Sequence, residues 1–263
     1  MVDTKVKGLT VVITGGSSGI GLETARLFLK EGARVAICGR DANRLENARL
    51  DLGGEASKLM SFQCDVLDRE QVNEFARAVG EKFGGADILI NNAGQARVAT
   101  FAEASDDDWR AEFELKLFSV IYPTRAFLPM LEKSGVPAIV CSNALLARQP
   151  EPHLVLTSSA RAAILNMVRS LANEFAPKGI RVNSILIGIV ESGQLHRRHE
   201  AQAKDGESWD AWSSALARAR KIPLGRLGLS GEAANAIFFL ASPMASYITG
   251  TAIDVSGGLS RNV

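Results

Sequence analysis

Cysteine, histidine and net charge are all scarce in this sequence. It has three cysteines and three histidines among 263 residues, and its formal net charge is +1. Three cysteines without metal-ligand spacing argue against a disulfide framework or a zinc site and suit a reducing cytoplasm. No apolar run reaches the roughly 20 residues of a membrane span, and no secretory signal precedes the first motif. We therefore expect a cytoplasmic protein that binds no metal, no nucleic acid and no membrane.

What the chain does contain is a regular alternation of apolar runs and helical patterns. Strands are expected at 9–13, 33–38, 59–63, 86–90, 138–141, 180–186 and 251–255. Helices are expected at 22–29, 41–52, 69–83, about 106–131, about 156–175 and 231–240. This alternation predicts a single α/β domain over residues 1–263, with a doubly wound seven-stranded parallel sheet and helices on both faces.

A glycine-rich turn joins the first expected strand to the first expected helix. Residues 14–21 read Thr-Gly-Gly-Ser-Ser-Gly-Ile-Gly. Gly15 allows a tight turn, Gly19 lets a phosphate approach the backbone, and Gly21 lets the helix pack near the strand. The helix N-terminus then favours a pyrophosphate. The turn predicts dinucleotide binding, although glycines also occur at such turns for structural reasons alone.

Residues 191–222 do not fit the alternation, because this stretch is long for a connection. Its cationic and aromatic residues are His196, Arg197, Arg198, His199, Trp209, Trp212, Arg218, Arg220 and Lys221. One interpretation is a lid that prefers an acidic or aromatic substrate. The other is a solvated helix pair, since four carboxylates are interspersed. No third ligand accompanies His196 and His199, so we interpret them as surface residues.

Four motifs follow one another along nearly the whole chain. They are residues 14–21, Asn-Asn-Ala-Gly at 91–94, the run at 169–183 and the run at 247–258. Together they resemble the short-chain dehydrogenase/reductase family. The resemblance implies a Rossmann fold, a nicotinamide cofactor, oxidoreductase activity on a carbonyl or hydroxyl group of a small molecule, and a homotetramer or homodimer.

Cofactor choice in this family is read just after the second strand, where the sequence is Cys38-Gly39-Arg40. Gly39 stands where a carboxylate would hold the 2′-hydroxyl of NAD, and the guanidinium of Arg40 suits the extra phosphate of NADP. The sequence thus favours NADP over NAD, unless Arg40 only starts a loop. The glycine turn and the resemblance together place these residues at the cofactor: Gly15, Ser17, Ser18, Gly19, Ile20, Gly21, Arg40, Asp65, Val66, Asn91, Ala93, Gly94, Arg161, Gly188, Ile189 and Ser192.

The four catalytic residue types that the resemblance implies are all replaced. Thr157 stands at the tyrosine position, Arg161 at the lysine position, Ala144 at the serine position and Lys116 at the asparagine position. An aliphatic hydroxyl is roughly 7 kcal/mol worse as an acid than tyrosine. Ala144 has no hydroxyl, and Arg161 keeps its proton while it donates hydrogen bonds. The two tyrosines of the chain are not obvious replacements.

Lys116 is the candidate for the missing proton donor. Its reference pKa of about 10.4 is close to that of tyrosine and should fall in a dry cavity beside Arg161. We predict that Lys116 is the general acid or an electrostatic clamp on the substrate oxygen; the alternative is a solvent-facing pair with Glu112. Asn143 is a further candidate, as is His153, which is equally compatible with an ordinary loop histidine.

Two classes of function stay open. The retained cofactor residues favour an NADP-linked oxidoreductase with atypical acid–base residues. The loss of the catalytic types favours a cofactor-binding pseudoenzyme or regulatory subunit. An enoyl-type reductase or a lyase is a third hypothesis, because proton delivery to carbon can use other donors.

Overall fold

In the computed structural model, the protein is built around one parallel sheet. The structure describes residues 4–53, 55–203 and 206–261. Its seven strands lie in the order β3-β2-β1-β4-β5-β6-β7. They are β1 (Thr10–Thr14), β2 (Arg34–Gly39), β3 (Leu59–Gln63), β4 (Ile88–Asn91), β5 (Ala138–Ala144), β6 (Arg181–Ile187) and β7 (Ala252–Val255). The direction of winding reverses between β1 and β4, which is where such folds bind ligands. The predicted doubly wound, seven-stranded Rossmann-like fold is confirmed.

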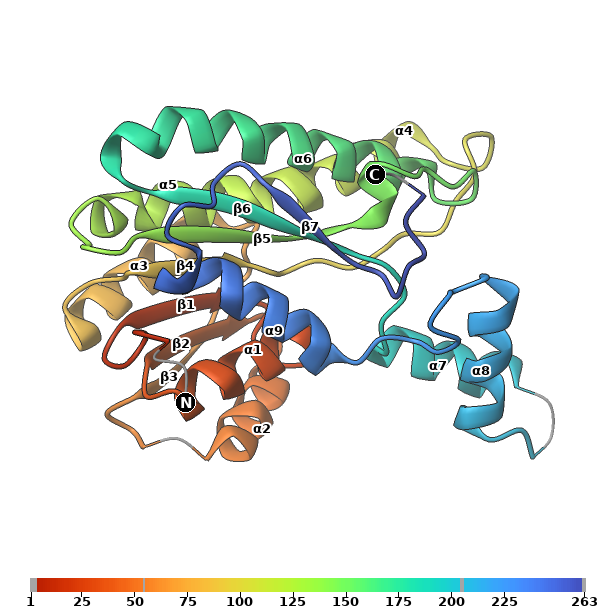
Figure 1. Ribbon diagram of the computed structural model, residues 1–263, viewed down its shortest axis with the longest axis horizontal. Helices are drawn as coiled ribbons and strands as arrows, with labels where there is room; N and C mark the ends of the chain where they lie inside the picture. Colours follow the sequence, from red (N-terminus) through yellow and green to blue (C-terminus); the bar gives the residue numbers. More distant parts are fainter. Residues whose placement is uncertain (1–3, 54, 204–205, 262–263) are drawn as a thin grey trace.

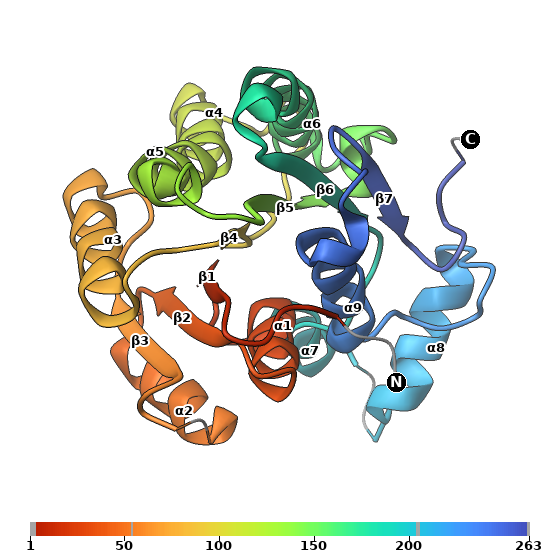
Figure 2. The same ribbon diagram turned by 60° about the vertical axis from the view of Figure 1, so that its left-hand side comes forward.

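Helices cover both faces of this sheet, as Figures 1 and 2 show. They are α1 (Gly19–Lys30), α2 (Ala42–Leu52), α3 (Arg69–Phe83), α4 (Asp106–Phe113), α5 (Ser119–Leu131), α6 (Val155–Phe175), α7 (Gly193–Gln202), α8 (Trp209–Ala219) and α9 (Ser230–Ala241). In Figure 2, α3, α4, α5 and α6 lie on one face of the sheet, and α1, α2 and α9 lie on the other. The result is a three-layer domain.

Each face of the sheet has its own apolar core. Val12 and Leu89 point into the core that contains Phe75 of α3. Their strand neighbours Val11 and Ile88 point into the opposite core. Because both faces are covered, the central strands are continuously apolar rather than alternating. Both faces of the sheet are thus covered by packed side chains, so a ligand-binding site can form only at the ends of the strands.

The prediction of a single helix over about 106–131 is wrong in one respect. A π-helical turn, Glu114–Phe118, separates α4 from α5. Lys116 lies in this turn and is only 1% exposed. Apolar periodicity does not distinguish such a wide turn from an α-helix, which is why the sequence did not reveal it. Turns of this kind are frequent at functional sites.

The predicted lid consists mainly of α7 and α8, which extend away from the sheet in Figure 1. The ring centroids of His196 and Trp209 lie 3.8 Å apart, and those of Trp209 and Trp212 lie 5.5 Å apart. Aromatic packing therefore joins the two helices. Positions 204 and 205 of the predicted lid lie outside the described residues.

The described residues contain neither a metal-ligand group nor a membrane-spanning helix. No group of three or more His, Cys, Asp or Glu side chains there could hold a metal ion. No helix in the same part of the chain has both the length and the apolar character needed to cross a membrane.

Candidate functional site

A cavity of about 470 Å³ opens at the carboxyl ends of the strands. We call it the strand-end cavity. Thirteen of the residues predicted for the cofactor line it: Gly15, Ser17, Ser18, Gly19, Ile20, Arg40, Asp65, Val66, Ala93, Gly94, Arg161, Gly188 and Ser192. Residues from the ends of six different strands, far apart in the sequence, thus surround one space.

The other three predicted cofactor residues lie outside the wall of this cavity. A Cβ atom at Gly21 would lie 2.3 Å from the carbonyl oxygen of Gly15, so this glycine permits the close approach of α1 to the turn. Asn91 is buried, and its Nδ2 donates to Thr124 Oγ1 at 3.1 Å. Ile189 lines a second cavity described below.

The N-terminus of α1 is suited to an anion. Ser18 is its N-cap residue but makes no side-chain capping hydrogen bond, and the first turn contains no acidic residue. In contrast, Asp41 caps α2 and Asp68 caps α3 through their side chains. Since Ser18 and Gly19 line the strand-end cavity, the positive end of α1 faces it without a competing carboxylate. A phosphate group fits this position.

Arg40 provides a second cationic feature at the rim of the same cavity. Its side chain is 62% exposed, and its Nη1 lies 3.9 Å from Asp65 Oδ2. An exposed pair at this distance is weak, so the guanidinium can meet another anion. A Cβ atom at Gly39 would lie 3.1 Å from Ser17 Oγ, so a larger residue at position 39 would crowd this wall.

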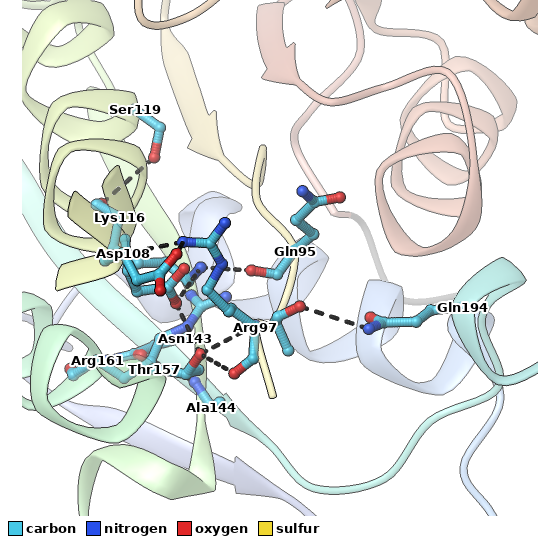
Figure 3. A network of polar contacts seen from close by, with 12 residues as sticks. Gln95, Arg97, Asp108, Lys116, Ser119, Asn143, Ala144, Thr157, Arg161 and Gln194 are labelled. Carbon is cyan, nitrogen blue, oxygen red and sulfur yellow. Dashed lines mark hydrogen bonds and ion pairs between the residues drawn. The ribbon is translucent and has the colours of Figure 1, made fainter. Parts of the chain in front are cut away.

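A buried polar network lies beyond the inner end of the strand-end cavity (Figure 3). Glu112 Oε1 accepts hydrogen bonds from Thr157 Oγ1 at 2.7 Å and from Lys116 Nζ at 2.8 Å. Lys116 Nζ also donates to the backbone oxygen of Gln95. Thr157 Oγ1 accepts from the backbone N–H of Arg97 at 3.2 Å. The pairing of Lys116 with Glu112 was expected as an alternative, but the pair is buried and does not face solvent.

We define the charge cluster as Lys116, Glu112 and Arg161. Burial, and then repulsion from Arg161, lower the pKa of Lys116 to about 8, although Glu112 opposes this shift. Burial also lowers the pKa of Arg161 to about 10. The cluster contains two cations and one carboxylate. Its excess positive charge is poorly solvated, so an anion or a developing negative charge beside it would be stabilised.

Arg161 is held by its neighbours, yet its buried Nε is unpaired among the described residues. Its Nη1 donates to the backbone oxygen of Ser142 at 2.7 Å. Asn143 Nδ2 donates to the backbone oxygen of Arg161 at 3.0 Å, and Asn143 Oδ1 accepts from the Ala144 N–H at 2.9 Å. The buried Nε of Arg161 has no partner among the described residues. Because buried donors are rarely left unpaired, an oxygen of a ligand fits here.

A second cavity, of about 550 Å³, lies between β5, α6 and the helices α7 and α8. We call it the lid cavity. It shares Ala96, Ala144, Arg161, Ile187, Gly188, Val190 and Gln194 with the strand-end cavity. Thr157 and His153 line the lid cavity, whereas Lys116 lines neither. The two cavities therefore share Arg161, and Thr157, whose hydroxyl bonds Glu112, lines the lid cavity.

Two predicted residues have their polar groups committed to neighbours. Ser192 Oγ accepts from the Leu195 N–H at 3.3 Å and caps α7. His153 Nε2 lies 3.2 Å from Glu151 Oε2, which is consistent with a loop histidine held by local contacts. Both residues still line a cavity.

Neither tyrosine lies beside the junction of the two cavities. Tyr122 belongs to α5 and packs against Phe118, with ring centroids 5.0 Å apart. Tyr247 is fully exposed. Neither belongs to the walls of the two cavities. No tyrosine thus substitutes for the side chain of Thr157 in this part of the structure.

Sequence reasoning gave Glu112 only a surface role. Its spacing from Lys116, one helical turn, signals a contact between the two side chains. That Glu112 also bonds Thr157, and that it is 3% exposed, depends on how α4 packs against α6. No local pattern in the sequence carries that information.

The comparisons with known proteins agree with this geometry. A family model described as enoyl-(acyl carrier protein) reductase matches residues 15–260. An uncharacterized short-chain type dehydrogenase/reductase, y4mP of Sinorhizobium fredii, is 34% identical over 262 residues, with 97% of this chain and 98% of that protein covered. The 3-oxoacyl-[acyl-carrier-protein] reductase FabG of Thermotoga maritima is 32% identical over 255 residues, with 97% and 99% covered.

Two solved structures are similar over almost their full length. One is the NADPH-bound structure of a short-chain oxidoreductase from Pseudomonas aeruginosa PAO1 containing an atypical catalytic centre. It is 57% identical, with a TM-score of 0.92, and the match covers 97% of this chain and 98% of that one. The other is L-sorbose reductase from Gluconobacter frateurii complexed with NADPH and L-sorbose. It is 32% identical, with a TM-score of 0.93, and both chains are covered completely.

Proposed function

The chain belongs to the short-chain dehydrogenase/reductase family of oxidoreductases, and we propose that it is an NADP-linked enzyme. It interconverts a carbonyl and a hydroxyl group of a small molecule, with atypical acid–base residues. The observation that carries this proposal is the meeting of the two cavities at Arg161, which belongs to the charge cluster with its excess positive charge.

The strand-end cavity fits NADP. The uncapped N-terminus of α1 would hold the pyrophosphate, and Arg40 would hold the additional phosphate of the adenosine ribose. The unpaired Nε of Arg161 would donate to an oxygen at the nicotinamide end. When bound, NADPH supplies the hydride. The NADPH held by two structurally similar proteins supports this assignment.

The charge cluster would stabilise the substrate oxygen as it becomes negative. Arg161 borders both cavities, and it cannot act as an acid near neutral pH because its pKa stays near 10. Its contribution would be positive charge and hydrogen bonding in a site with little water. An oxyanion here would also relieve the repulsion between Arg161 and Lys116.

We further propose that the proton travels from Lys116 through Glu112 and Thr157. The Thr157 hydroxyl gives its proton to the substrate oxygen, Glu112 returns one to Thr157 Oγ1, and Lys116 returns one to Glu112. Glu112 and Thr157 end unchanged, and Lys116 ends neutral. The contacts of 2.7 and 2.8 Å support the two transfers between protein groups, and a lysine pKa of about 8 suits a donor near neutral pH.

One assay tests the proposed function. The protein is mixed with NADPH and with a panel of ketones, aldehydes and enoyl thioesters, and the absorbance of the reduced nicotinamide is followed. We expect substrate-dependent loss of this absorbance with at least one carbonyl compound. We also expect NADPH to raise the melting temperature more than NADH does. NADPH binding without oxidation across the panel would instead support a cofactor-binding protein without dehydrogenase activity.

Location and assembly are further parts of the proposal. The three cysteines, Cys38, Cys64 and Cys141, are buried and free, which is consistent with a reducing compartment such as the cytoplasm. The resemblance to its family supports a homodimer or homotetramer. Sedimentation of the purified protein would distinguish these assemblies from a monomer.

A further inference from the structure

The lid cavity carries positive charge but no negative charge on its wall. Its lining includes Arg161, Arg198 and Arg220, whereas no aspartate or glutamate belongs to the lining among the described residues. Arg161 is at the junction with the strand-end cavity, and Arg198 and Arg220 line the lid cavity alone. The lid cavity therefore offers cationic side chains, and no anionic ones among the described residues, to a ligand.

Arg220 is already neutralised. Its Nη1 lies 2.7 Å from Glu151 Oε2, and its Nη2 lies 3.4 Å from His153 Nε2. His153 Nε2 is itself 3.2 Å from the same Glu151 oxygen. These three side chains form a closed group, so Arg220 has no charge left to offer a substrate.

Arg198 has no such partner. Its Nε donates to the neutral amide oxygen of Gln202 at 2.9 Å, and its guanidinium carbon lies 6.0 Å from the ring centroid of Trp212. No carboxylate lies within ion-pair distance of it in the part of the chain that the structure describes. Arg198 is exposed, and its guanidinium is oriented by Gln202 and Trp212, so the remaining N–H groups can form a two-point contact with a carboxylate.

Between Arg161 and Arg198 the wall is mostly apolar. The apolar side chains include Leu145, Leu154, Ile189, Leu195, Leu216 and Leu259. Such a surface suits a hydrocarbon body, and the neutral amides on the wall are those of Gln149, Gln194 and Gln202. Arg161 is assigned to the reacting oxygen, which leaves one guanidinium, that of Arg198, for a charged group of the substrate; one such cation matches a carboxylate better than a phosphate dianion.

We propose that the substrate is an oxo or hydroxy monocarboxylate whose carboxylate binds Arg198 and whose apolar body fills the lid cavity. This inference rests on the proposed function and names the substrate class of the same site. The reacting oxygen would then lie at the Arg161 end, next to Thr157. Arg198 acts only in binding, so its loss should raise KM far more than it lowers kcat.

The test compares acids with their neutral esters. Titration calorimetry is run with 5-oxohexanoate, 7-oxooctanoate and 9-oxodecanoate and with the three methyl esters, at low ionic strength, with and without NADP⁺. We expect at least one acid to bind about tenfold more tightly than its ester. The Arg198→Gln variant should lose this preference. Added salt should weaken it in the unmodified protein.

Arg197→Gln is the matched control, because Arg197 is exposed on the same helix and lines neither cavity. This variant should keep the preference for acids. Equal affinity for acids and esters in the unmodified protein, no binding of either, or a preference that survives Arg198→Gln would each overturn the assignment. Failure to bind NADP⁺ would count against the proposed function instead, while the acid–ester comparison would still report on Arg198.

Discussion

The strand-end cavity and the charge cluster are built in different ways. The wall of the cavity consists largely of backbone and small side chains that follow the strands, as at Gly15, Gly19 and Gly94. The charge cluster consists of long ionised side chains that are buried together, with Lys116 1% exposed and Glu112 3% exposed. The first depends on local backbone geometry and the second on packing between distant helices.

This difference teaches where the chain can vary. A phosphate site made from a helix N-terminus needs no particular side chain, so it persists when neighbouring residues change. A proton donor needs one group with a suitable pKa and a route to the substrate. In this chain the glycine turn at residues 14–21 is kept, whereas Lys116, Thr157 and Arg161 stand where the family resemblance implies other residue types.

Replacing Lys116 by methionine should have the largest effect. Turnover should fall about 10²–10⁴-fold, the usual contribution of a general acid, because the proposed relay loses the group that supplies its proton. The dissociation constant of NADPH should change less than about twofold, since Lys116 does not line the strand-end cavity. Steady-state kinetics and fluorescence titration measure the two quantities.

The matched control is the double variant Lys116→Met with Glu112→Gln. It removes the carboxylate of Glu112, which the single variant would leave without its lysine partner. If the double variant folds, binds NADPH and is equally inactive, the loss belongs to catalysis and not to stability. Unchanged turnover in Lys116→Met would remove Lys116 from the mechanism.

The next largest effect concerns stability. Glu112→Gln leaves the buried Lys116 and the half-buried Arg161 without this carboxylate and should cost roughly 3–5 kcal/mol of the free energy of unfolding. Asp108→Asn breaks the exposed pair of Arg97 and Asp108, which are 2.6 Å apart, and should cost at most about 1 kcal/mol. Urea denaturation measures the free energy of unfolding of both variants. Similar losses in the two variants would contradict a buried charge cluster.

A smaller effect is expected at the rim of the strand-end cavity. Arg40→Ser should raise the dissociation constant of NADPH about tenfold and leave that of NADH nearly unchanged, because only NADPH carries the additional phosphate. The modest size follows from the exposure of this side chain, which is 62%. Calorimetric titrations with both cofactors check it, and an equal change for both would mean that Arg40 does not select between them.

These two regions also differ in how far the sequence predicts them. The parallel sheet follows from apolar periods. Most of the wall around the strand-end cavity follows from the glycine turn at residues 14–21 and from the family resemblance. The π-helical turn at Lys116 does not, because apolar spacing tolerates either type of turn. The contact between Glu112 and Thr157 joins residues 45 positions apart and depends on the packing of α4 against α6.

The sequence also does not predict the pairing of Arg220 with Glu151, because the two residues are 69 positions apart and meet only in the folded chain. In the sequence, Arg198 and Arg220 are equivalent cations within one basic stretch. Only the fold brings Glu151 from the connection before α6 to Arg220, while none of the described carboxylates pairs with Arg198. Charge composition therefore suggested an acidic substrate, and tertiary structure indicates which arginine would bind it.

The ionisation of Lys116 tests the central claim most directly. Nitrogen-15 NMR of lysine-labelled protein, with Lys116→Met used for assignment, would follow the Nζ signal as pH rises. We predict a midpoint near pH 8. Because the folded-state pKa lies below that of an unfolded lysine, this group should also make the protein more stable as pH rises from about 8 to about 10.5. A Lys116 signal that titrates near 10.5, like a solvent-exposed lysine, would contradict a buried cluster with excess positive charge.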